Sequence, residues 1–268
     1  MNYNLDQAGR QSLLEKIKID DKKLNISLSH KDFIKNVNKV NLLFEDQLTE
    51  SQLIQLVMYR DVRHIVQNSL QKADEKIQFL NQLVTKSSEY FGLDFNMLEE
   101  GSASEIFEFT ALTDRQELID KVCAFCLMDP SSGRSARPIQ VMEEMVMNAQ
   151  INAPQLRQGP ISARSFIKVE YSDKLMAISV FDYYGSLDWK KFFKKIENGL
   201  ALGLDKALNF GRGGAGIGST IIFKNCDSLF LGVIPFKKTR ISVIMPYKAA
   251  DKKYENIQKS IHIIESQE

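Results

Sequence analysis

The feature that most constrains the fold is the grouping of strand-like and helix-like segments between residues 105 and 247. In chain order, one strand-like segment precedes two helix-like segments and two pairs of strand-like segments: 105–113, 114–128, 139–153, 164–172, 175–186, 227–236 and 239–247. Apolar–polar alternation predicts half-buried strands, and apolar residues three or four positions apart predict helices. Because strands and helices cluster, this order predicts an α+β fold and not a repeated βαβ sheet.

Composition describes an ordinary globular protein. Of the 268 residues, 44% are apolar and 26% are charged, and the formal net charge is +1. This balance gives no indication of a nucleic-acid partner or of binding to a membrane surface. The first residues lack the pattern of a secretory signal, and no apolar run reaches the roughly 18 residues of a membrane span.

The cysteines indicate a reducing compartment. There are three, an odd number, so we expect a cytoplasmic protein without a disulfide framework. Cys123 and Cys126 form a C-x-x-C, but they lie in a helix-like run with no second pair elsewhere. A buried helix face explains them better than a zinc or redox site does.

Patterns outside the central region divide the chain into three expected parts. Residues 1–103 are predicted to be mostly helical with one strand-like segment, and the GSAS at 101–104 is predicted to be a hinge. The main domain is expected over 104–248. In the tail, 249–268, apolar side chains at helical spacing predict an amphipathic helix: Tyr254, Ile257, Ile261 and Ile264.

The segment GRGGAGIGSTIIF, residues 211–223, is the main candidate for ligand binding. Its many glycines allow backbone N–H groups to approach a ligand closely, and a helix start favours an anion such as phosphate. It lacks the lysine of a Walker A loop. It also matches G-x-G-x-x-G, but the dinucleotide fingerprint follows a strand and has an acidic residue about 20 positions later, where this chain is basic.

Four separated elements resemble a third nucleotide-binding pattern. Gly214, Gly216 and Gly218 form a G-x-G-x-G box. Upstream, an expected helix carries E-x-x-x-N, with spacing that places both side chains on one face, and an expected strand ends in D-Y-Y-G; a threonine opens a late strand. The residues of these three elements are Glu144, Asn148 and the following Asn152; Asp182 and Gly185; and Thr239. In this order they resemble the GHKL ATPases, whose ATP-binding unit is the Bergerat fold.

The resemblance implies a two-layer sandwich, in which a mixed, mostly antiparallel sheet has helices on one face and follows a helix-rich N-terminal region. It implies ATP and Mg²⁺ as cofactors and assigns roles to the motif residues. Asp182 would accept a hydrogen bond from the adenine amino group, with Gly185 allowing close approach and Thr239 beside them. Asn148, with Asn152 nearby, would ligate Mg²⁺, and Glu144 would be the general base.

The glycine box would bind the phosphates through backbone N–H groups. A flexible lid would cover the nucleotide from Trp189 to Asn209, with Arg212 near the phosphate charge. The four lysines of this run are better explained as a solvated helix face: Lys190, Lys191, Lys194 and Lys195.

Among GHKL proteins, the chain looks closest to the anti-sigma-factor serine kinases, in which a strand, a helix and a short loop lead into the E-x-x-x-N helix. This similarity implies a regulatory protein-serine kinase or an anti-sigma-factor-like switch. Its protein partner would be a sigma factor, an antagonist of the anti-sigma factor or a response regulator. Residues 1–103 would serve dimerisation, as in a homodimer, or partner binding.

Alternative hypotheses stay open. One is a histidine kinase core with His64 as phosphoacceptor, because HIVQNSL loosely resembles the phosphoacceptor box. Another treats 1–103 as a degenerate internal copy, because the ten residues from His64 align without gaps on the ten from Glu144. A third is a non-catalytic, nucleotide-responsive binding module.

Overall fold

The structure is a computed structural model. It describes residues 24–27, 31, 34, 40–45, 48–67, 88–98, 101–157, 163–202, 217–248 and 258–266. The chain divides into two compact units, Met1–Tyr90 and Phe91–Glu268. The division falls before the GSAS segment at which we expected a hinge, because residues 91–98 pack on the second unit, as described below.

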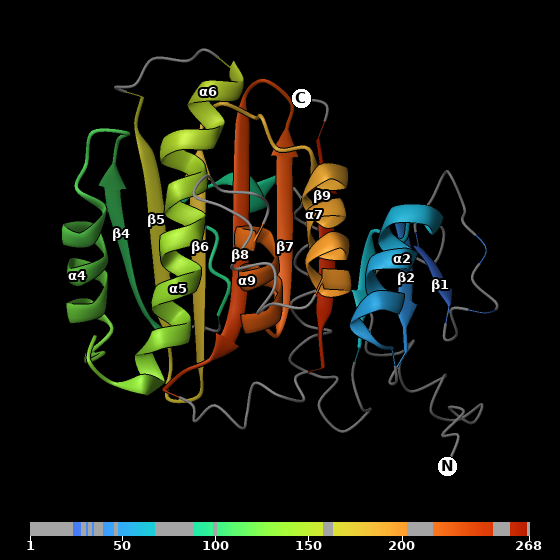
Figure 1. Ribbon diagram of the computed structural model, residues 1–268, viewed down its shortest axis with the longest axis horizontal. Coiled ribbons are helices and arrows are strands. Elements are labelled where there is room, and N and C mark those ends of the chain that lie inside the picture. Colours follow the sequence, from blue (N-terminus) through green and yellow to red (C-terminus); the bar gives the residue numbers. More distant parts are fainter. Residues whose placement is uncertain are drawn as a thin grey trace. The chain divides into compact units, whose positions relative to one another are not determined.

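The second unit is built around a mixed sheet (Figure 1). The order of its strands is β9-β7-β8-β6-β5-β4. The strands are β4 (Ala103–Phe109), β5 (Ser165–Tyr171), β6 (Leu175–Asp182), β7 (Ser228–Ile234), β8 (Lys238–Pro246) and β9 (Ser260–Glu265). Neighbouring strands are antiparallel except for β7 and β9, which are parallel. The α+β class and the mostly antiparallel sheet are therefore confirmed.

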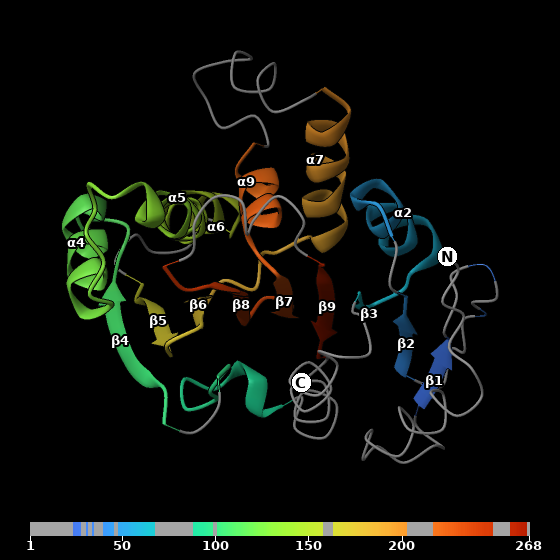
Figure 2. The ribbon, with the colours of Figure 1, turned by 90° about the horizontal axis from the view of Figure 1, so that it is seen from below.

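The helices of this unit cover one face of its sheet (Figure 2). They are α4 (Arg115–Phe125), α5 (Gly133–Met147), a π-helical turn η3 (Asn148–Asn152), α6 (Ala153–Arg157), α7 (Trp189–Leu202) and α9 (Ile217–Asn225). Asp114 caps α4, since its Oδ1 accepts from the Glu117 N–H at 2.9 Å. The core between the helices and the sheet is apolar and fully buried, with Met142, Ile167 and Phe223 among its members.

A short segment of chain covers the opposite face of the sheet (Figure 2). We call its residues, Phe91–Leu98, the strap; its first residue is the last of the 3-10 turn η2 (Glu89–Phe91). Phe91, Phe95 and Met97 of the strap are buried. The expected two-layer arrangement is thus supplemented by a strap that sequence patterns did not reveal.

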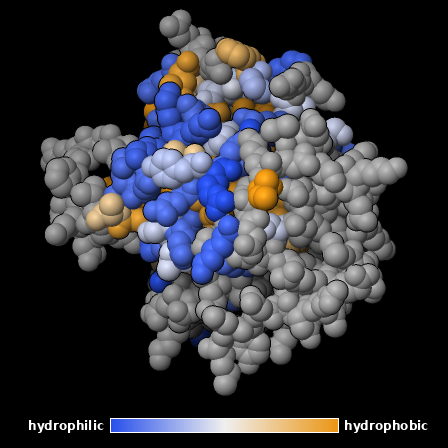
Figure 3. All heavy atoms as spheres, turned by 90° about the vertical axis from the view of Figure 1, so that its right-hand side faces the viewer, coloured by the Kyte–Doolittle hydropathy of each residue, from blue (hydrophilic) through white to orange (hydrophobic). Residues whose placement is uncertain are grey.

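The first unit contains a small parallel sheet and a helix. β2 (Val40–Phe44) lies between β1 (Leu24–Ser27) and β3 (His64–Val66), and both of its pairings are parallel. Helix α2 (Glu50–Arg60) begins with a capping box, in which the Thr49 hydroxyl accepts from the Gln52 N–H and the Gln52 side chain accepts from the Thr49 N–H. On the face seen in Figure 3, most of the described surface is hydrophilic, with hydrophobic atoms interspersed.

Several local predictions were wrong. In the described part of 1–103, helix α2 is accompanied by three strands, β1, β2 and β3, where the sequence predicted one strand-like segment. His64 opens strand β3 whereas Glu144 lies in a helix, which removes the basis for an internal copy. In the tail, Ser260–Glu265 is a strand buried at every position but the last, because an isoleucine-rich run suits a strand with both faces covered. Tyr254 and Ile257 lie outside the described residues.

The expected lid is also largely a packed helix. In α7 the side chains of Trp189, Phe192, Phe193 and Ile196 are buried, which fixes this helix by its apolar face. The four lysines lie on its exposed face, as predicted. The rest of the expected lid, 203–209, lies outside the described residues.

Candidate functional site

A buried carboxyl group at the end of β6 is the first element of the candidate site. Asp182 is 7% exposed, and its Oδ1 accepts from the Tyr184 N–H at 2.9 Å. Burial raises the pKa of Asp182 from 3.8 to about 6, although the nearby Tyr184 N–H, Thr239 hydroxyl and Gly185 N–H oppose that rise. A carboxyl group so well shielded from water is suited to accept a hydrogen bond from a donor group of a ligand.

Thr239 lies directly across from Asp182 in the antiparallel pair β6–β8. Its hydroxyl is close enough to the carboxyl to lower the pKa of Asp182, yet it makes no hydrogen bond of standard geometry. The side chain is 2% exposed. Buried hydroxyl groups are rarely left unsatisfied, so this one is available to a water molecule or a ligand group.

Gly185 brings two backbone segments together beside these side chains. Its φ is +55°, and a Cβ there would lie 2.3 Å from the Ile234 carbonyl oxygen and 2.6 Å from the Phe236 nitrogen. The Phe236 N–H donates to the Gly185 carbonyl at 3.2 Å. Only glycine fits here, so the D-Y-Y-G sequence places its glycine where the backbone requires one.

Glu144 forms a second group with Gly218 across the packed helices α5 and α9. A Cβ on Gly218 would lie 2.0 Å from Glu144 Oε2, so the carboxylate rests against the bare Cα of Gly218. Half-burial raises the pKa of Glu144, and Glu143 adds to the rise, whereas Arg115 at the start of α4 opposes it. A carboxyl group with a raised pKa beside a glycine-rich segment has the properties of a general base or acid.

Asn148 follows Glu144 by one helical turn, as its N–H donates to the Glu144 carbonyl. Here α5 widens into the π-helical turn η3, a feature frequent at functional sites. Within η3 the Asn152 Nδ2 donates to the Asn148 Oδ1 at 2.6 Å. The buried Gln150, which sequence patterns did not reveal, donates to the carbonyls of Thr110 and Thr113, both at 3.0 Å, and so ties η3 to the β4–α4 loop.

The predicted residues thus form two groups, both associated with the helix-covered face of the sheet. One contains Asp182, Gly185 and Thr239; the other contains Glu144, Asn148, Asn152 and Gly218. The two are linked because α5 and η3 both pack on β6, the strand that ends in Asp182. Arg212, Gly214 and Gly216 lie outside the described residues, and α9 begins at Ile217, one residue before Gly218.

Asn148 and Glu144 are the oxygen donors of this group that could take part in binding a metal ion. No group of three or more His, Cys, Asp or Glu side chains that could hold a metal occurs in the described part of the chain. Magnesium is commonly held by one or two protein oxygens together with substrate phosphates. The half-buried Asn148 offers one such oxygen, one turn from the Glu144 carboxylate.

His64, Cys123 and Cys126 were the other candidate residues from the sequence. His64 lies in β3, and burial lowers its pKa to about 4, with Arg63 adding to the decrease. Cys123 and Cys126 are both buried, as predicted, and burial raises the pKa values of their thiols to about 11 and 12. Within the described ranges, no helix has the length and apolar character needed to cross a membrane.

Comparison with known proteins gives no family. No protein-family model matches the chain, and a search of curated proteins found no similar sequence.

Proposed function

We propose that the chain binds Mg·ATP on the helix-covered face of its sheet, in a GHKL-type arrangement of the Bergerat fold. The single observation that carries the proposal is the buried pair of Asp182 and Thr239, an acceptor and an unsatisfied hydroxyl side by side at the end of β6. Adenine presents an amino donor next to a ring nitrogen acceptor, which complements this pair. Gly185 contributes indirectly, because its missing Cβ lets the chain after Asp182 pack against the backbone of Ile234 and Phe236.

At the phosphate end, the contact between Glu144 and Gly218 supports the proposed chemistry. Backbone N–H groups of the glycine-rich segment and the start of α9 would bind phosphate oxygens. Mg²⁺, ligated by the Asn148 oxygen, would neutralise charge on those phosphates. Glu144 would accept the proton of an attacking hydroxyl, a task favoured by its raised pKa.

The favoured reaction is transfer of a phosphoryl group to a serine hydroxyl of a protein partner. A sigma factor, an antagonist protein or a response regulator would be bound by this switch, with the first unit available for dimerisation or partner binding. The position of His64 in a strand, with a lowered pKa, gives no support to the histidine kinase alternative.

The first test is calorimetric titration of the full chain with ATP in the presence and absence of Mg²⁺, and with NAD and NADP. We expect Mg²⁺-dependent binding of ATP that weakens at least tenfold in Asp182→Asn and is unchanged in Asp173→Asn, an exposed residue of the β5–β6 turn. Binding of NADP alone, or of no nucleotide, would overturn the proposal.

Turnover is tested separately with Glu144→Gln. We expect the variant to keep ATP binding and to lose about 10²-fold or more in phosphoryl transfer or ATP hydrolysis, the usual contribution of a general base. Glu105→Gln, which replaces an exposed glutamate of β4, is the control. Wild-type binding without any turnover would identify a nucleotide-responsive binding module instead of an enzyme.

A further inference from the structure

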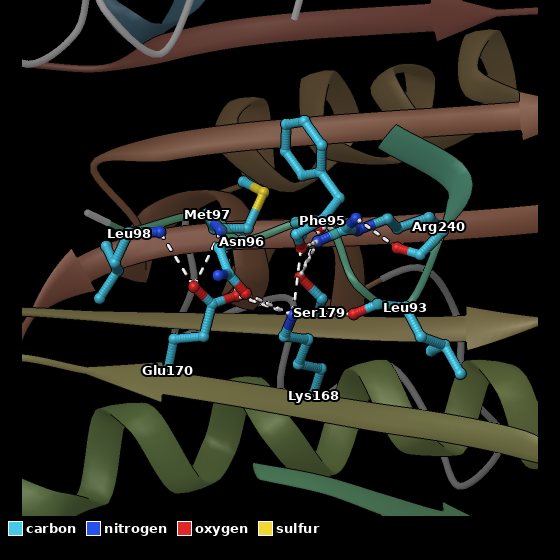
Figure 4. A network of polar contacts seen from close by, with 11 residues as sticks. Leu93, Phe95, Asn96, Met97, Leu98, Lys168, Glu170, Ser179 and Arg240 are labelled. Carbon is cyan, nitrogen blue, oxygen red and sulfur yellow. Dashed lines mark hydrogen bonds and ion pairs between the residues drawn. The ribbon is translucent and has the colours of Figure 1, made fainter. Parts of the chain in front are cut away.

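The strap is held on the sheet by buried charged side chains that the proposed nucleotide site does not use (Figure 4). Lys168 of β5 is 3% exposed, and its Nζ donates to the carbonyls of Leu93 and Phe95 at 2.8 and 3.2 Å and to Asn96 Oδ1 at 2.7 Å. Burial lowers the pKa of Lys168, with Arg240 adding to the decrease, while Glu170 opposes it. The ammonium group thus depends on strap atoms for its hydrogen bonds.

Glu170, two residues further along β5, binds the other end of the strap. It is 2% exposed, and its carboxylate accepts from the Met97 N–H at 2.9 and 3.1 Å and from the Leu98 N–H at 3.0 Å. Its Oε1 lies 3.9 Å from the Lys168 ammonium. Removing such a buried charge leaves its partners unsatisfied, so the strap and the sheet stabilise each other.

Arg240 of β8 completes the set and is fully buried. It donates to the strap carbonyls of Gly92 and Phe95, both at 3.4 Å, and to the Ser179 and Ser242 hydroxyls, both at 3.0 Å. Its guanidinium carbon lies 5.3 Å from the centre of the Phe95 ring. The neighbouring Lys238 donates to the Phe91 carbonyl at 3.0 Å.

Strand β8, which binds the strap through Lys238 and Arg240, also carries Thr239 of the proposed adenine site. Side chains alternate along a strand, so Lys238 and Arg240 point to the strap while Thr239 between them points to the helix-covered face. The same alternation applies on β6. The centre of the Phe181 ring lies 4.6 Å from the guanidinium carbon of Arg240, and the next residue along β6 is Asp182. Thr239 and the β8 anchors Lys238 and Arg240 are therefore adjacent residues on opposite faces of one strand, and Asp182 lies across from Thr239 on β6.

We propose that docking of the strap is coupled to nucleotide binding, so that the strap regulates the affinity of the site. This inference rests on the proposed function. The docked strap holds β8 against β6 through Arg240, Ser179 and Ser242, which keeps Asp182 and Thr239 in register. Release of the strap loosens that pair and weakens ATP binding.

The coupling is reciprocal, since two linked binding events must affect each other by the same factor. Mg·ATP should therefore slow hydrogen exchange of the strap amides in the wild-type chain by about fivefold or more, the lower end of typical couplings. The amides of Met97 and Leu98 report this directly because Glu170 binds both. In Asp182→Asn, the same addition of Mg·ATP should leave strap exchange unchanged.

The variant test uses Glu170→Gln, which removes the charge at nearly constant size, and Asn96→Ala, an exposed strap residue whose loss is milder for folding. We expect about fivefold weaker Mg·ATP binding in Glu170→Gln and a smaller effect of the same sign in Asn96→Ala. Glu108→Gln, on the exposed face of β4 with Arg164 at 3.5 Å, is the matched control and should bind as the wild type does.

The outcomes separate this inference from the proposed function. If the wild type binds Mg·ATP but strap exchange does not respond, and both strap variants bind normally, the coupling is refuted and nucleotide binding stands. If the wild type binds no adenine nucleotide, both are refuted. If hydrogen exchange of the strap is faster in Glu170→Gln but the affinity for ATP is unchanged, the coupling is refuted and the strap has only a structural role.

Discussion

Replacing Asp182 by Asn should stabilise the protein at neutral pH, even though it removes the central residue of the proposed site. In the native state the pKa of Asp182 lies at about 6, against 3.8 for the free group. A native pKa above the unfolded one means that the folded state holds the proton more tightly. Stability from this group is therefore full below about pH 4 and is lost as the pH rises through about 6.

The magnitude follows from the shift. A change of about two pKa units corresponds to about 3 kcal/mol between the fully protonated and fully ionised states. Asparagine is neutral at every pH, keeps an oxygen for the Tyr184 N–H, and offers an amide donor to the unsatisfied Thr239 hydroxyl. The free energy of unfolding of Asp182→Asn relative to wild type should therefore rise by up to about 3 kcal/mol from pH 4 to pH 8.

Urea unfolding followed by the fluorescence of Trp189, the single tryptophan, measures this difference. Trp189 is 5% exposed at the start of α7, in the same unit as Asp182, so it reports on the relevant transition. Asp173→Asn controls for replacing a carboxyl group elsewhere on the same sheet. A difference between Asp182→Asn and wild type that stays constant from pH 4 to pH 8 would show that the carboxyl is not desolvated. The argument for an adenine acceptor would then fail.

Three further substitutions test the geometry. In Gly218→Ala the new Cβ would lie 2.0 Å from Glu144 Oε2, so the carboxylate should move by about 1.4 Å to an ordinary contact distance. Turnover should fall about 10²-fold without a lower melting temperature. Gly133→Ala, at a position with no atom near the added Cβ, should leave turnover unchanged. Gly185→Ala, at φ +55° against backbone atoms, should cost about 2 kcal/mol or more in urea unfolding, and a cost below about 0.5 kcal/mol would contradict the close approach. Lys259→Met should cost about 3 kcal/mol, because its buried ammonium binds three carbonyls at the end of α9; unchanged stability would refute this.

Local patterns predicted the elements whose contacts are close in sequence. The pairs β5–β6 and β7–β8 follow from apolar–polar alternation interrupted by turns, and α4 from its Asp114 cap. The spacing of Glu144 and Asn148 correctly indicated a shared helical face. These are the cases in which the residues that decide the structure lie within about one turn or one hairpin of each other.

Elements decided by distant partners were predicted incorrectly or not at all. The tail strand β9 pairs with β7 and is buried on both faces, so its sequence lacks the apolar–polar alternation of a half-buried strand. Its isoleucines therefore fit the spacing of a helix as well as that of a strand. Helix α5 begins at Gly133, before the expected segment 139–153, because Ser132 caps the helix by accepting from the Arg134 N–H. One lost helical hydrogen bond at Pro138 is tolerated within a helix buried against the sheet.

The strap shows most clearly why part of the site lay beyond sequence patterns. Lys168 and Glu170 alternate with apolar residues in β5, which is the usual pattern of a strand with one face in water, and only contacts 72 to 75 residues away bury them. From the sequence of such a strand alone, one cannot tell whether water or another segment of the protein covers its polar face. Its composition nevertheless differs from that of an ordinary wet face, because Arg240, Ser179 and Ser242 supply donors and acceptors matched to a backbone. Opposite charges two residues apart in a strand, with an arginine on a nearby strand, are therefore a reason to look for a covering segment elsewhere in the chain.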